Sequence, residues 1–140
     1  MPGPKPRFTK QITTSVWLPV TEVIQRRAWG QGMSAAALSR VYMTPYAERI
    51  AECQDSGKPL DLPSLEAANI VFGAIVLGHA DYNRQVIQVS PDMEQLYRSG
   101  RDQINQQEFN DCMSISRLIC LALTERAAVV EMGSRMGTSH

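Results

Sequence analysis

The sequence predicts a mainly helical protein with one two-stranded antiparallel ribbon. The first observation is size and composition: 140 residues with 44% hydrophobic and 20% charged side chains suit one compact globular unit. The second is that two separate segments alternate apolar and polar residues, the period of a strand, and each ends at a proline. The third is that apolar residues elsewhere recur at spacings of three and four, which is typical of helices.

The first strand is predicted over residues 11–18. One face carries Ile12, Thr14, Val16 and Leu18, and the other carries Gln11, Thr13, Ser15 and Trp17. Pro19 ends this strand and suits the first turn of a helix. That helix places Val20, Val23, Ile24 and Ala28 at helical spacing, and we expect it to end at Gly30 and Gly32.

Three further helices are predicted in the first half of the chain. Ser34 is a good N-cap for a helix that carries Leu38, Val41 and Tyr42. Thr44 and Pro45 are expected to end this helix and to start another, which runs to about Cys53. Residues 55–63 have turn composition, and Ser64 is expected to cap an apolar, mostly buried helix to about Gly78.

The second half repeats the pattern of the first. Residues 84–91 form an alternating strand that ends at Pro91, and Met93, Leu96 and Tyr97 continue as an amphipathic helix. Met113-Ser114, followed by Leu118, Leu121 and Ala122, matches Met33-Ser34, followed by Leu38, Val41 and Tyr42. The offset is 72 residues at the prolines and 80 at the Met-Ser pairs, and residues 103–111 supply the difference. Few identities are shared, so the pattern alone leaves both a repeat and a coincidence open.

A lone strand cannot satisfy its backbone hydrogen bonds, so each strand needs a partner. We therefore expect the two strands to pair antiparallel, with one face on the helices and the other open. The inner face is predicted to hold Ile12, Thr14, Val16, Leu18, Ile87 and Val89. The open face is predicted to hold Thr13, Ser15, Trp17, Arg84, Val86 and Gln88.

Residues 10–43 and 84–127 resemble the ribbon-helix-helix superfamily of DNA-binding proteins, the MetJ and Arc type. The matching segments are ITTSVWLPVTEVIQRRAWGQGMSAAALSRVY, RQVIQVSPDMEQLYRSG and CMSISRLICLALTERA. Most members are homodimers, and two copies in one chain resemble the rarer tandem, single-chain form. That form is found among DNA-transfer accessory proteins, such as TraY-type relaxosome proteins and overdrive-binding proteins of T-DNA transfer.

The resemblance implies a non-enzymatic protein that inserts its ribbon into the major groove of double-stranded DNA. Because the two strands differ, the site is expected to be non-palindromic. Base contacts are expected from Thr13, Ser15, Trp17, Arg84, Val86 and Gln88, with Arg84 on guanine and Gln88 on adenine. Phosphate contacts are expected from Lys5, Arg7, Lys10, Ser34, Ala35, Ser114 and Ile115. The implied role is to help assemble a conjugation or T-DNA transfer complex with other DNA-processing proteins.

Two other functions stay open. A repressor or antitoxin of the same fold would also bind DNA, and sequence alone does not separate it from a transfer accessory protein. An adaptor would instead use Trp17, Val86 and the helix over residues 64–78 to bind proteins. The net charge of zero favours the adaptor, although residues 1–43 carry +5, residues 44–81 carry −4 and residues 82–140 carry −1.

The expected organisation is a flexible basic arm (1–9), a first unit with an extra helix (10–54), a linker with the apolar helix (55–82), a second unit (83–130) and a flexible tail (131–140). The two units are expected to pack as one domain.

No cofactor, metal or small-molecule substrate is expected, because Cys53, Cys112 and Cys120 form no CxxC pair, the two histidines are isolated and no catalytic motif is found. The apolar stretch over residues 67–80 has only 14 residues, whereas a bilayer needs about 20, so we expect no membrane partner and a cytoplasmic location.

Overall fold

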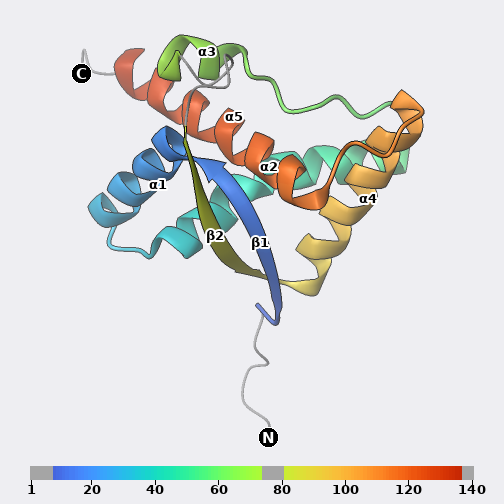
Figure 1. Ribbon diagram of the computed structural model, residues 1–140, viewed down its shortest axis with the longest axis horizontal. Helices are drawn as coiled ribbons and strands as arrows, with labels where there is room; N and C mark the ends of the chain where they lie inside the picture. Colours follow the sequence, from blue (N-terminus) through green and yellow to red (C-terminus); the bar gives the residue numbers. More distant parts are fainter. Residues whose placement is uncertain (1–7, 74–80, 137–140) are drawn as a thin grey trace, which may run out of the picture.

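The computed structural model describes residues 8–73 and 81–136, in which five helices pack with one two-stranded sheet (Figure 1). The elements follow the order β1 (Lys10–Trp17), α1 (Leu18–Gly30), α2 (Ala35–Ser56), α3 (Glu66–Phe72), β2 (Tyr82–Val89), α4 (Pro91–Glu108) and α5 (Ile115–Met136). The predicted mainly helical fold with one antiparallel ribbon is confirmed. Lys5, Arg7, Gly78 and His79 lie outside the described residues.

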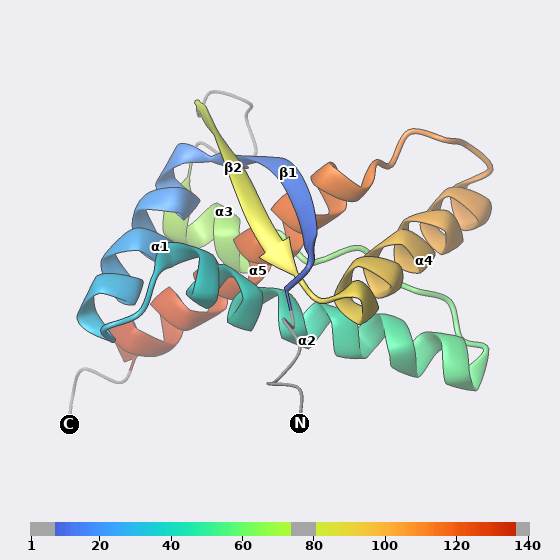
Figure 2. The same cartoon turned by 90° about the horizontal axis from the view of Figure 1, so that it is seen from below.

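The two strands pair antiparallel over their whole length, from Lys10 opposite Val89 to Trp17 opposite Tyr82. Both views place α1 and α4 on opposite sides of this ribbon (Figures 1 and 2). The long helices α2 and α5 pack against each other and against the ribbon. One face of the ribbon is therefore covered by helices, as the alternating sequence predicts.

The covered face of the ribbon is part of the core. Its buried side chains are Ile12, Thr14, Val16, Ile87 and Val89. Its polar members are hydrogen-bonded: the Thr14 hydroxyl donates to the Ser116 carbonyl (2.7 Å), and the Gln85 amide donates to the Thr21 hydroxyl (2.8 Å). Hydrogen bonds of this kind offset the cost of desolvating these polar groups and fix the ribbon on the helices.

The predicted orientation of Trp17 and Leu18 is wrong. Trp17 is only 6% exposed, whereas Leu18 is exposed and belongs to α1. The strand ends one residue before Leu18, whose N–H donates to the Asp81 carbonyl (2.7 Å), so the alternation stops there. The Trp17 ring packs beside Tyr82 with 5.6 Å between ring centroids, and its Nε1–H has no hydrogen-bond partner in the described part of the chain.

The predicted helix break at Thr44 and Pro45 is also wrong, because α2 continues through Pro45 to Ser56. A proline inside a helix removes one backbone hydrogen bond. Here the loss is offset by packing on both sides of the proline. The buried α2 residues are Leu38, Ser39, Tyr42, Met43, Tyr46, Ala47 and Ile50.

The apolar helix predicted from Ser64 is shorter and more exposed than expected. Helix α3 starts at Glu66 and ends before Gly73, whose φ of +64° breaks the helix, and Ala68 is its buried residue. At the other end of the chain, α5 continues to Met136, so residues 131–136 are helical rather than part of a flexible tail. No helix among the described residues is both long and apolar enough to span a membrane.

Candidate nucleic-acid interface

The uncovered face of the ribbon, here called the open face, carries three cross-strand pairs. These pairs are Gln11 opposite Gln88, Thr13 opposite Val86 and Ser15 opposite Arg84. All six side chains are exposed. Side chains directly opposite each other on one face of an antiparallel pair lie about 5 Å apart, so the six form one contiguous patch.

The structure brings together five of the expected base-contacting residues, Thr13, Ser15, Arg84, Val86 and Gln88. It does not bring Trp17 to them, because that ring is buried at the end of the ribbon. Gln11 occupies the remaining position of the patch, opposite Gln88. Sequence reasoning placed Gln11 on the right face but did not select it, and the strict alternation from residue 11 to residue 15 was the signal.

The open face offers the groups that read base edges. Guanidinium, amide and hydroxyl side chains donate and accept hydrogen bonds, while Val86 and the Thr13 methyl offer apolar contact. The major groove of B-DNA is about 12 Å wide and admits a two-stranded ribbon. It presents a different donor and acceptor pattern for each base pair, so the side chains of such a patch are able to distinguish sequences.

The starts of α2 and α5 have the same geometry. The Ser34 hydroxyl accepts from the Ala37 N–H (3.0 Å), and the Ser114 hydroxyl accepts from the Arg117 N–H (3.1 Å). In the described part of the chain, no hydrogen bond uses the N–H groups of residues 35, 36, 115 or 116. Such N–H groups and the positive end of the helix dipole favour a phosphate, which keeps Ser34, Ala35, Ser114 and Ile115 as candidate phosphate contacts.

Two arginines near the ribbon were missed by sequence reasoning. Arg40 on α2 donates to the Gln88 carbonyl (3.1 Å), and its guanidinium lies 3.9 Å from the centre of the Phe8 ring. Arg117 on α5 is exposed, and with Ser15 and Tyr82 it lines a cavity of about 300 Å³. Each arginine lies within two helical turns after an N-cap serine. This spacing is the sequence signal that could have identified both arginines as neighbours of the ribbon. Lys10 is exposed at the first position of β1.

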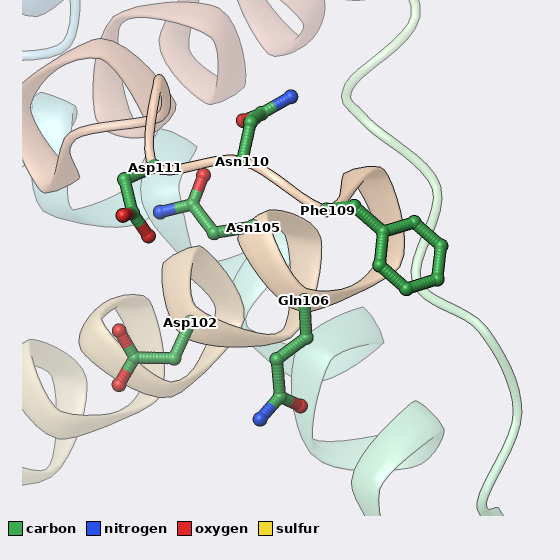
Figure 3. A pocket seen from close by; sticks show the side chains of 6 residues that line it. All are labelled: Asp102, Asn105, Gln106, Phe109, Asn110 and Asp111. Atoms are coloured by element: carbon green, nitrogen blue, oxygen red, sulfur yellow. The ribbon is translucent and has the colours of Figure 1, made fainter.

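A second cavity, of about 620 Å³, lies at the turn between α4 and α5 (Figure 3). Its lining residues are Asp102, Asn105, Gln106, Phe109, Asn110 and Asp111. The Asn105 side chain fixes the turn by bonding both the N–H and the carbonyl of Met113 (3.0 Å each). Two carboxylates make this cavity a poor match for phosphate. Within the described ranges, no three His, Cys, Asp or Glu residues are grouped so that they could hold a metal ion.

Comparison of the chain with protein-family models, with curated proteins and with solved structures gave no match. The case for a nucleic-acid interface therefore depends on the open face and on its surroundings.

Proposed function

We propose that this protein binds double-stranded DNA by placing the β1–β2 ribbon in the major groove, and that it does so without enzymatic activity. The observation that carries the proposal is the open face, where three cross-strand pairs expose five polar side chains and Val86 in one patch. An exposed two-stranded ribbon flanked by two helix starts is an arrangement that suits the major groove and its phosphates.

The ribbon-helix-helix resemblance also supports the proposal that the ribbon binds DNA. Strands β1 and β2 both have eight residues, and helices α2 and α5 both have 22. The N-cap hydrogen bonds of Ser34 and Ser114 correspond at an offset of 80 residues. We infer from these correspondences that the chain is a tandem repeat in which one polypeptide replaces the two subunits of a dimer.

A role as an accessory protein in conjugation or T-DNA transfer is part of the proposal, and the sequence resemblance is what supports it. A single-chain ribbon suits such a role because its two strands differ. It therefore matches a non-palindromic site better than the ribbon of a homodimer does. In this role the protein would mark a DNA site and recruit other DNA-processing proteins.

A protein-binding adaptor is the second candidate function. It is favoured by two aromatic side chains, Trp29 at the end of α1 and Phe109 after α4, which are 88% and 94% exposed. Large exposed aromatic side chains are enriched at protein interfaces. An adaptor would bind proteins through these ends of the helices and would not need the open face.

An electrophoretic shift assay on random-sequence duplexes at low and high salt separates the two functions. We expect specific duplexes to be retained, and the double variant Arg84→Ala with Gln88→Ala to lose that specificity. The matched control is Arg98→Ala with Gln95→Ala, which removes the same residue types from the exposed side of α4. Failure to retain any duplex at low salt would overturn the proposal and favour the adaptor.

A further inference from the structure

The two ends of the open face differ in chemistry. One end is the pair Ser15 and Arg84, and the other end is the pair Gln11 and Gln88. The central pair, Thr13 and Val86, presents methyl groups from both strands. Arginine pairs with the O6 and N7 atoms of guanine, glutamine pairs with the N6 and N7 atoms of adenine, and methyl groups contact thymine. The ends therefore suit different base pairs.

Each end of the open face also lies beside a different helix start. Ser15 shares a cavity of about 300 Å³ with Ser114, Ser116 and Arg117, so the Arg84 end lies beside the start of α5. The Thr14 hydroxyl, which donates to the Ser116 carbonyl, holds the two elements together there. At the opposite end, Arg40 of α2 donates to the Gln88 carbonyl, so the glutamine end lies beside the start of α2.

The cavities at the two ends differ as well. The cavity beside α2, about 360 Å³ in volume, has a mainly apolar lining that includes Phe8, Met33, Val41, Val89 and Met93. The cavity beside α5 is lined by four residues with hydroxyl groups (Ser15, Tyr82, Ser114 and Ser116), by Cys120 and by Arg117. Arg117 has no ion-pair partner among the described residues. A guanidinium and hydroxyl groups favour a phosphate at this end.

We propose that the protein binds its DNA site with one fixed polarity. The Ser15–Arg84 pair would lie over a G·C pair on the α5 side, and the Gln11–Gln88 pair would lie over A·T pairs on the α2 side. This inference rests on the proposed DNA binding and adds the orientation of the protein on its site. In the reversed orientation, Arg84 would face adenine and the glutamines would face guanine.

The length of the patch sets the spacing of the two elements of the site. Ser15 lies four positions after Gln11, which corresponds to about 13 Å along the strand. Base pairs are stacked about 3.4 Å apart along the helix axis, and the ribbon follows the inclined groove, so the two preferred positions should lie no more than about four base pairs apart. Each lost bidentate contact lowers affinity by roughly tenfold. Reversal loses the contacts of Arg84, Gln11 and Gln88, so it should weaken binding on the order of 1,000-fold.

Base-pair substitution across a selected site tests the polarity. A duplex is first selected from a random pool, and each base pair is then changed in turn. We expect Arg84→Ala to abolish discrimination at one end of the site, and Gln11→Ala with Gln88→Ala to abolish it at the other end, within about four base pairs. Arg98→Ala and Gln25→Ala, both at exposed helix positions, are the matched controls.

Two outcomes of this scan are distinguishable. If no duplex is selected, the proposed DNA binding itself fails. If a duplex is selected but has palindromic symmetry, or if both variants lose discrimination at the same base pairs, DNA binding stands and the fixed polarity is overturned.

Directed cleavage gives a second, independent readout of the polarity. An iron chelate is attached to a cysteine at Gln31 or at Asp111, exposed residues that each precede an N-cap serine by three positions. The background carries Cys53→Ser and Cys112→Ser, because these two thiols are not buried. We expect the Asp111 probe to cut the flank beside the G·C element and the Gln31 probe to cut the opposite flank. Equal cleavage of both flanks by each probe would overturn the fixed polarity.

Discussion

Two glutamates on α5 each form ion pairs or hydrogen bonds with two residues from other parts of the chain. Glu131 forms ion pairs with Arg26 and with Arg27 (2.5 Å for Arg27), which both lie on α1. Glu125 accepts from the Arg49 side chain (3.2 Å) and from the Ser64 N–H (2.6 Å). Because each carboxylate oxygen has its own partner, these two residues fasten α5 to α1, to α2 and to the segment before α3.

The Glu131 contacts predict a pH-dependent contribution to stability. Burial raises the pKa of the Glu131 carboxyl, but the hydrogen bonds and charges of Arg27 and Arg26 outweigh burial, so the pKa lies below its usual value of 4.5. A carboxyl whose pKa is lowered by folding stabilises the protein above its unfolded-state pKa, and this stability is lost as the pH falls through the folded-state pKa. We expect Glu131→Gln to lower the free energy of unfolding by about 1–2 kcal/mol at pH 7.

Urea unfolding followed by circular dichroism at pH 7 and at pH 3.5 measures this effect. The difference between the wild type and Glu131→Gln should shrink at the lower pH, since protonation removes the same ion pairs. Glu48→Gln, on the exposed side of α2, is the matched control and should change little. An equal difference at both pH values would show that the ion pairs do not cause the loss.

At the scale of elements, α2 and α4 approach each other closely at Gly100. A Cβ atom on this residue would lie 2.7 Å from the Ile50 Cδ1 atom and 3.0 Å from its Cγ1 atom. Ile50 is fully buried, with 0% exposure, so its side chain has no free space to enter. Gly100 is therefore required by packing between the helices rather than by backbone conformation.

A double-mutant cycle tests this contact. Gly100→Ala should gain about 1 kcal/mol of helix propensity but lose about 1–3 kcal/mol to overpacking, so we expect a net destabilisation of up to about 2 kcal/mol. Ile50→Val removes the Cδ1 atom, and in that background Gly100→Ala should be neutral or stabilising. The coupling free energy from thermal or urea unfolding should exceed 1 kcal/mol. Additive effects of the two substitutions would contradict the predicted clash.

The elements also show what local sequence signals cannot determine. Alternation and proline positions located both strands to within two residues, since β1 spans 10–17 against 11–18 predicted and β2 spans 82–89 against 84–91 predicted. They also located the starts of α1 and α4, and the serines before α2 and α5 located the starts of those helices. Pro45 was misread because the packing that carries α2 through it comes from residues distant in sequence. Trp17 was misread because its burial beside Tyr82 depends on where the strand turns into a helix. Five members of the open face were selected correctly because a strand alternates regardless of its tertiary context.

For the whole molecule, the fold gathers charge that is scattered in the sequence. The net positive charge is concentrated in residues 1–43, which carry +5, while residues 82–140 carry a net charge of −1. The antiparallel pairing nevertheless places Arg84 on the same ribbon as Lys10, and α5 brings Arg117 beside Ser15. The charge gradient along the chain therefore did not reveal Arg117, because the packing of α5 against the ribbon joins segments that are distant in sequence.

The salt dependence of DNA binding tests whether this gathered charge contacts phosphates. The logarithm of the affinity should fall linearly with the logarithm of the salt concentration, with a slope of about −0.9 for each phosphate contact. Arg117→Ala should make the slope shallower by about 0.9 and should weaken binding to all duplexes alike, because phosphates carry no sequence information. Arg98→Ala, whose guanidinium pairs with Glu94, is the control and should leave the slope unchanged. An unchanged slope for Arg117→Ala, together with a loss of discrimination at particular base pairs, would show that Arg117 contacts bases and not phosphates.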